Sequence, residues 1–338
     1  MKLIFHIGAG KTGSTSIQRT LRENDALLKE RGVWYLGLML ERVDTKLYEW
    51  QKTSSVVPEF HRLSDEEAQK QILDVLRPII EEAKAKKIDT LIWSNESFLG
   101  GKHNFTGALQ QLQKESVEVE ILIYVREYGS WARSAYVQWG IKHKTYKGKL
   151  QTFKEWSKRH TPSFNKEIKN LLGIMPETVN VRNMSAVKDV VFDFFDFAKI
   201  NSDSIKIFRD NDSPKNEELL FRALFNSKYN EEVLPVRFEN IIGRNISFST
   251  TPQMYLESLL PSQTDLEEVV INTFDDQNAI NKLLEIEGQD QLKGIRASIK
   301  SNEINNDKML LALADIVMQQ SRRIDKLERL LQNIELKG

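Results

Sequence analysis

The chain has 338 residues, which is long for one domain and short for two of average size. Its 48 lysines and arginines equal its 48 acidic residues, so the charge balance gives no reason to expect a nucleic-acid partner. The absence of cysteine excludes disulfides and thiolate metal sites, and is typical of a reducing compartment. No apolar run approaches the ~20 residues of a transmembrane segment, and no signal-peptide pattern opens the sequence. We therefore expect a cytoplasmic protein.

The first motif joins a strand, a glycine loop and a helix. Residues 3–7 form an apolar run typical of a buried strand, and residues 14–31 have helical periodicity that ends at Arg31-Gly32. Between them, glycines let the backbone approach a ligand, and backbone N–H groups at the helix start attract an anion, as does Lys11. The motif therefore predicts a phosphate site, formed by Gly10, Lys11, Thr12, Gly13, Ser14, Thr15 and Ser16.

Two general phosphate motifs fit this loop only in part. A Walker A loop would end correctly at Gly10-Lys11-Thr12, but its first glycine would fall at Phe5. The dinucleotide fingerprint matches Gly8-x-Gly10-x-x-Gly13, but it requires an acidic residue about twenty positions on, and Glu41 comes late. Taken whole, Lys-Thr-Gly-Ser-Thr-Ser at residues 11–16 resembles the 5′-phosphosulfate loop of the sulfotransferases.

The middle of the chain continues the alternation of helices and strands. Ser64 and Glu67 form a capping box before a helical run in which Pro78 should cause a kink. A short buried strand follows at residues 90–94. Glu96 comes just after it and should face the same cleft as Lys11.

A second motif follows the buried strand at residues 120–125. Arg126 ends that strand, and Ser134 lies eight positions on, in a helical run. The carboxyl edge of an open α/β sheet is where ligands bind, and an arginine with a hydroxyl can hold a phosphate. Arg126 and Ser134 resemble the 3′-phosphate site of sulfotransferases. Together with the first loop, this spacing resembles the bacterial carbohydrate-type members of that family.

The resemblance implies a reaction and a set of site residues. The sulfuryl donor would be 3′-phosphoadenosine-5′-phosphosulfate, the product 3′,5′-bisphosphoadenosine, and no metal would be needed. Lys11 would stabilise the charge that develops on the leaving phosphate. Glu96 would act as the base on the acceptor, with His103 as the alternative base. The acceptor would be a glycan, a glycolipid or another small molecule.

The order of elements predicts an α/β fold, with a P-loop-like parallel sheet flanked by helices and a C-terminal helical extension. The last clear strand is expected at 178–182 and a phenylalanine-rich helix at 187–197. We expect a cofactor-binding core over 1–230, a helical cap or acceptor-binding region over 231–300, and an amphipathic helix over 301–338. Asn211 and Ser213 are candidates for structural positions only.

The C-terminal helix has a strict heptad seam, formed by Leu310, Leu313, Val317, Gln320, Ile324, Leu327, Leu331 and Ile334. This seam predicts a coiled coil that pairs subunits through residues 310–334. The alternative is an amphipathic helix packed on its own domain. Two other functions stay open, namely a P-loop nucleotide kinase-like enzyme and a scaffold that assembles through this helix.

Overall fold

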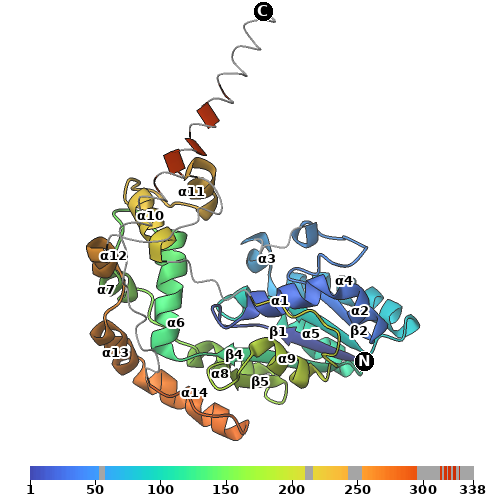
Figure 1. Ribbon diagram of the computed structural model, residues 1–338. Helices are drawn as coiled ribbons and strands as arrows, with labels where there is room; N and C mark the ends of the chain where they lie inside the picture. The colour runs from blue at the N-terminus through green and yellow to red at the C-terminus, as the bar shows by residue number, and fades with distance from the viewer. Residues whose placement is uncertain are drawn as a thin grey trace, which may run out of the picture. The chain divides into compact units, whose positions relative to one another are not determined.

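The computed structural model describes residues 1–52, 58–209, 216–242 and 253–294, and eight residues between 313 and 327. The chain divides into two compact units, each built from separate stretches (Figure 1). Unit 1 comprises Met1–Glu127, Ser163–Asn211 and Thr273–Gly294, and unit 2 comprises Tyr128–Pro162, Asp212–Asn272 and Ile295–Gly338. The domain boundaries expected from the sequence at 230 and 300 stay predictions.

Unit 1 is built on a parallel sheet. In the described part of the chain the sheet has five strands in the order β2-β3-β1-β4-β5. Each is parallel to its neighbours, and β1 pairs with β3 on one side and β4 on the other. The strands are β1 (Lys2–His6), β2 (Val33–Gly37), β3 (Thr90–Ser94), β4 (Glu118–Val125) and β5 (Val179–Asn183). The predicted α/β class with an all-parallel, helix-flanked sheet is confirmed.

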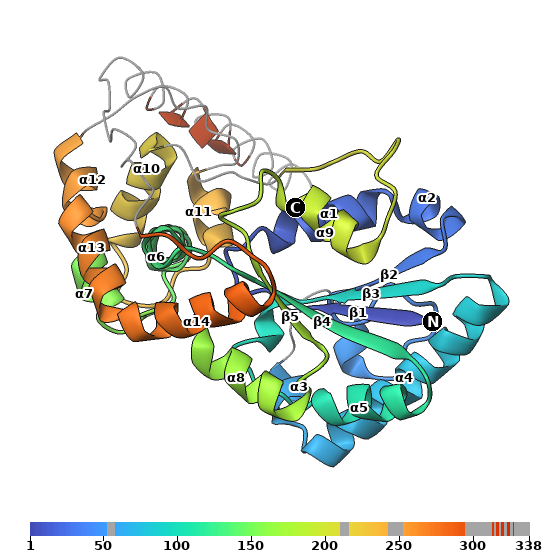
Figure 2. The same ribbon diagram turned by 90° about the horizontal axis from the view of Figure 1, so that it is seen from below.

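Helices cover both faces of this sheet. Figure 2 shows α1, α2 and α9 on one face and α4 and α5 on the other, while α14 packs against α8 and β5. The helices of unit 1 are α1 (Ser14–Glu23), α2 (Asp25–Glu30), α3 (Pro58–Arg62), α4 (Asp65–Ala85), α5 (Thr106–Lys114), α8 (Asn165–Ile174), α9 (Val190–Ala198) and α14 (Phe274–Ile286). Two short 3₁₀ turns are η1 (Glu49–Lys52) and η2 (Glu96–Phe98).

Successive side chains of β1 point to opposite faces of the sheet, so this strand contributes to the core on both faces. Ile4 packs into the cluster beneath α1 and α9, which includes Ile17 and Phe194. On the opposite face, the ring of Phe5 stacks on Trp93 with centroids 4.0 Å apart. Both faces of β1 are therefore buried, as expected for a central parallel strand, and its carboxyl end is held rigidly between β3 and β4.

Three helices differ in detail from the expected ones. The helix expected over 14–31 divides at Asn24, whose amide donates to the carbonyls of Thr20 and Lys206, so its side chain competes with the helical pattern. Helix α9 starts at Val190 rather than 187, because Asp189 caps the N–H groups of Val191 and Phe192. Helix α4 has the predicted capping box and continues through Pro78.

Unit 2 is helical. Helix α6 (Tyr128–Ala135) continues directly into the π-helix η3 (Tyr136–Lys142) and packs against α13. The other helices are α7 (Phe153–Ser157), α10 (Asn216–Asn226), α11 (Pro235–Ile242), α12 (Gln253–Leu259) and α13 (Gln263–Asn272). Within the described ranges, no helix of either unit has the length and apolar character to cross a membrane.

The C-terminal seam is described only in part. Gln320 and Arg323 both donate to the carbonyl of Ile241 in the last turn of α11, where helix carbonyls lack intrahelical partners. The apolar seam residues in this region are 42–62% exposed, namely Leu313, Val317, Ile324 and Leu327. Three other seam residues, Leu310, Leu331 and Ile334, and the two candidates Asn211 and Ser213, lie outside the described residues.

Candidate anion-binding site

The glycine loop follows β1 and bends tightly before α1. Gly10, Lys11 and Gly13 all have positive φ, of 61°, 56° and 87°. Glycine adopts this region without strain, whereas for Lys11 it is uncommon and costs about 1 kcal/mol. Gly13 stands at the N-cap of α1, where no side chain caps the helix. The loop thus places backbone N–H groups at the carboxyl edge of the central strand, which is a favourable place for an anion.

Two hydroxyls in this loop are buried without a hydrogen-bond partner. Thr12 is 0% and Ser14 is 4% exposed, and no group within the described residues bonds either Thr12 Oγ1 or Ser14 Oγ. The hydroxyls converge over Gly8, where an added Cβ would lie 2.5 Å from Ser14 Oγ and 3.1 Å from Thr12 Oγ1. Buried polar groups in proteins are nearly always bonded, so this pair indicates a ligand that supplies the missing partner.

Arg126 lies against the same loop. It follows β4, which pairs with β1, and its Nη1 donates to the carbonyl of Lys11 at 3.2 Å. Burial lowers the pKa of the Arg126 guanidinium, and the neighbouring Glu127 raises it. A guanidinium stays charged in spite of such a shift, so a partly desolvated cation lies against the backbone of the loop. The structure thus brings Arg126 to the loop, and its predicted role in holding the 3′-phosphate stays a prediction.

Glu96 lies at the same edge, just after β3. The Cβ that would be added at Gly8 is 3.5 Å from Glu96 Cβ, which places Glu96 near the loop hydroxyls. Gln18 on α1 donates its side-chain amide to Glu96 Oε2 at 2.8 Å. This hydrogen bond orients the carboxylate, and Gln18 was not identified from the sequence.

His6 and Ser94 form a hydrogen-bonded pair that also contacts Gln18. His6 Nδ1 lies 2.8 Å from Ser94 Oγ, and the Gln18 amide donates to that oxygen at 3.3 Å. Burial lowers the pKa of His6 to about 3, so its ring is neutral near pH 7. Within the described structure, the Nε2 of this buried ring has no hydrogen-bond partner.

His103, the alternative base, is engaged elsewhere in unit 1. Its Nε2 lies 3.1 Å from the carbonyl oxygen of Leu99 and 3.7 Å from Glu167 Oε2 on α8. The imidazole therefore helps to hold the loop after η2. Glu96 has the stronger geometric case because it shares the edge with Thr12 and Ser14.

Three other predicted site residues have different surroundings. Thr15 is exposed and Ser16 is buried in the first turn of α1, where the Ser16 N–H donates to Gly13. Ser134 lies on α6 in unit 2, so its pairing with the loop stays a prediction. The preceding Arg133, which the sequence did not single out, is also partly buried, and burial lowers its pKa.

Metal binding and sequence relatives give no further assignment. Among the residues that the structure describes, no cluster of three His, Cys, Asp or Glu side chains could hold a metal ion. No protein-family model matches the chain, and no curated protein matches it.

Proposed function

We propose that this protein is a sulfotransferase that uses 3′-phosphoadenosine-5′-phosphosulfate. The observation that carries the proposal is the pair of buried, unpartnered hydroxyls of Thr12 and Ser14 in the glycine loop, against which Arg126 lies. The loop fits the oxygens of a phosphate group, because each oxygen can accept hydrogen bonds from hydroxyls and backbone N–H groups. The Lys-Thr-Gly-Ser-Thr-Ser sequence then favours a phosphosulfate over other phosphates.

The two phosphates of the donor would have separate sites. The 5′-phosphosulfate would lie on residues 10–16, with hydroxyl contacts from Thr12 and Ser14. Arg126 and Ser134 would hold the 3′-phosphate, and Arg126 would also brace the loop through the Lys11 carbonyl. In this proposal the loop between β1 and α1 is the P-loop-like part of the fold.

The donor supplies the sulfuryl group and leaves negative charge on its 5′-phosphate. The Lys11 ammonium would stabilise that charge, an effect that is largest in the transition state. Glu96, oriented by Gln18, would accept the proton from the attacking acceptor hydroxyl or amine. No metal is needed for these roles.

Acceptor and assembly complete the proposal. The acceptor would be a carbohydrate or glycolipid, and the enzyme would act in the cytoplasm. Subunits would pair through residues 310–334, because the apolar seam residues described there remain exposed. A kinase-like enzyme or a scaffold are the competing functions that the experiments must separate.

Removing the unpartnered hydroxyls tests this proposal. Thr12→Val and Ser14→Ala should weaken the binding of 3′,5′-bisphosphoadenosine about tenfold each, measured by calorimetry. Neither change should lower the free energy of unfolding, because an unpartnered buried hydroxyl is itself unfavourable.

Thr20→Val is the matched control. Thr20 is equally buried, but its hydroxyl accepts from the Phe208 N–H at 3.0 Å. Its removal should destabilise the fold by about 1–3 kcal/mol and leave nucleotide binding unchanged. The reverse pattern, with normal affinity in Thr12→Val and Ser14→Ala, would contradict the proposed site.

A further inference from the structure

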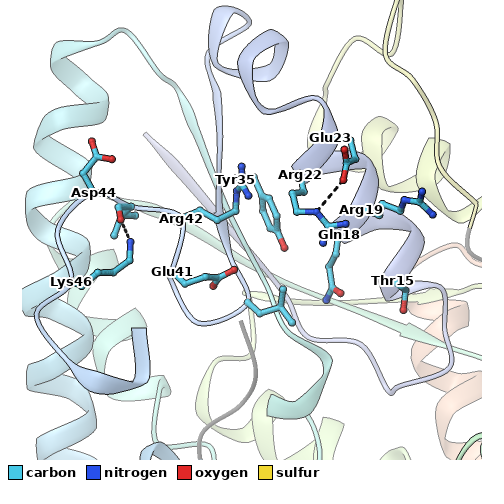
Figure 3. A pocket seen from close by; sticks show the side chains of 12 residues that line it. Thr15, Gln18, Arg19, Arg22, Glu23, Tyr35, Glu41, Arg42, Asp44 and Lys46 are labelled. Carbon is cyan, nitrogen blue, oxygen red and sulfur yellow. Dashed lines mark hydrogen bonds and ion pairs between the residues drawn. The ribbon is translucent and has the colours of Figure 1, made fainter. Parts of the chain in front are cut away.

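A large cavity of unit 1 adjoins the anion-binding loop. Its volume is about 1010 Å³, and its lining comes from α1, β2 and residues 38–46 (Figure 3). Thr15 and Gln18 belong to the lining, so the cavity begins where the loop ends. Gln18 also donates to Glu96 at 2.8 Å, so one residue of the lining is hydrogen-bonded to the proposed base.

The inner wall of the cavity holds two buried polar groups without partners. Tyr35 is 1% exposed, and within the described chain neither its hydroxyl nor the Arg42 Nε–H has a hydrogen-bond partner. Burial raises the pKa of Tyr35, as do Glu41 and Glu96, so the phenol is neutral and can donate. In Figure 3 the Tyr35 hydroxyl points toward the side of the cavity where Gln18 and Glu41 lie.

The lining as a whole is rich in cations. Four basic side chains line the cavity, namely Arg19, Arg22, Arg42 and Lys46. The three acidic side chains of the lining include Glu41, whose carboxylate accepts the Met39 N–H at 2.7 Å, and Glu23, which pairs with Arg22 at 3.2 Å. The acidic groups are therefore partly neutralised by the protein. Arg42 pairs with Asp25 through Nη2 at 3.4 Å, and its Nε–H remains available for an oxygen ligand.

We infer that this cavity binds the acceptor, and that the acceptor is a polyhydroxylated molecule that carries a carboxylate or a phosphate. Hydroxyls of the acceptor would bond Tyr35 and Gln18 at the end near Glu96. The acidic group would lie between Arg22 and Arg42, where guanidinium groups can bind it with paired hydrogen bonds. This inference rests on the proposed sulfotransferase function, because that function makes Glu96 the base.

Ligand-observed NMR with the full-length protein saturated with 3′,5′-bisphosphoadenosine tests the inference. The probes are methyl glucuronoside, glucose 6-phosphate and the neutral methyl glucoside. We expect at least one anionic sugar to bind about fivefold or more tightly than the neutral one. The two anionic probes distinguish a carboxylate from a phosphate.

Variants assign the binding to the cavity. Arg42→Gln should abolish the preference for the anionic probe. Arg22→Gln should reduce this preference, and because the Arg22 side chain is half-exposed, the fold should tolerate the change. Tyr35→Phe should weaken all bound sugars. Arg77→Gln is the matched control. Arg77 lies on α4, away from the cavity lining, where it pairs with Glu115 near the protein surface, so this change should have no effect.

The outcomes distinguish this inference from the proposed function. If the nucleotide binds but neither anionic sugar binds better than methyl glucoside, the inference is wrong and the sulfotransferase proposal stands. An Arg77→Gln effect equal to that of Arg42→Gln would also overturn it. If calorimetry of the same sample finds no nucleotide binding, the proposed function itself fails.

Discussion

At the residue scale, Lys11 and Arg126 carry the same charge, but removing each of them should have a different effect. Lys11→Ala should abolish turnover while weakening nucleotide binding less, because its charge matters most in the transition state. Arg126→Ala should mainly weaken nucleotide binding, by about 2–5 kcal/mol, since it is partly buried against the loop. Turnover assays and calorimetry on both variants check this. Near-normal turnover in Lys11→Ala would refute its role.

Glu96 should matter for rate and not for binding. Glu96→Gln should keep the fold and nucleotide affinity but reduce turnover by about 100-fold or more, because an amide cannot accept the acceptor's proton. His103→Ala is the control, and we expect a smaller loss because His103 bonds the Leu99 carbonyl and lies near Glu167. An inactive His103→Ala with an active Glu96→Gln would transfer the role of base to His103.

His6 should make stability depend on pH. Its folded-state pKa is about 3, whereas unfolded histidine titrates near 6.5, so the unfolded chain binds one more proton between these values. The free energy of unfolding should therefore fall as pH falls from 6.5 toward 3, by about 3–5 kcal/mol from this group. In denaturant titrations at several pH values, the free energy of unfolding of His6→Gln should depend less steeply on pH over this range. Identical pH dependence in the two proteins would show that folding does not lower the pKa of His6.

The sequence singled out candidate site residues by local motifs and by their positions just after predicted strands. Thr12, Ser14 and Arg126 follow strand ends, and parallel strands bring such ends to one edge. Gln18 and Tyr35 were missed because their importance depends on contacts across long sequence separations, to Glu96 and to the cavity. A glutamine on a helix has no distinguishing signal until its partner is known.

At the element scale, the start of α1 packs closely against α9. Gly13 has φ of 87°, and an added Cβ would lie 2.6 Å from Val190 Cγ1. Gly13→Ala should therefore destabilise the fold by about 2–4 kcal/mol, of which ~1 comes from backbone strain and the rest from overpacking. Chemical denaturation measures the loss.

Gly32→Ala is the matched control for this contact. Gly32 also has a positive φ, of 76°, but its added Cβ would meet the nearest atom at 3.5 Å, an ordinary contact. It should cost only about 1 kcal/mol. The double variant Gly13→Ala/Val190→Ala should lose less stability than the two single losses added together. Equal losses for Gly13→Ala and Gly32→Ala would exclude a specific α1–α9 contact.

Periodicity predicted the strands to within two residues at either end and the helices less well. The strands expected at 90–94 and 178–182 match β3 and β5 closely, because both are short apolar runs bounded by polar segments. The division at Asn24 was missed, since it depends on carbonyls of Thr20 and of Lys206, which lies 182 positions away. The local sequence pattern around residue 24 carries no information about a contact with so distant a residue.

At the scale of the whole molecule, the C-terminal seam should join subunits. The described seam residues, including Val317 and Leu327, remain exposed although Gln320 and Arg323 contact α11. Such an apolar stripe is rare on a soluble monomer. We expect a dimer, and deletion of residues 305–338 should give a smaller species in light scattering with normal nucleotide affinity. A full-length monomer at micromolar concentration would contradict this expectation.

The most direct test of the account is a calorimetric titration of the full-length protein with 3′,5′-bisphosphoadenosine, with and without Mg²⁺, next to ATP with Mg²⁺. The loop around Thr12 and Ser14, together with Arg126, should bind the bisphosphate at micromolar concentration or tighter. Binding should be independent of Mg²⁺, and at least tenfold tighter than that of ATP. Tighter binding of ATP with Mg²⁺ would indicate a kinase-like enzyme, and no binding of either nucleotide would contradict the site itself.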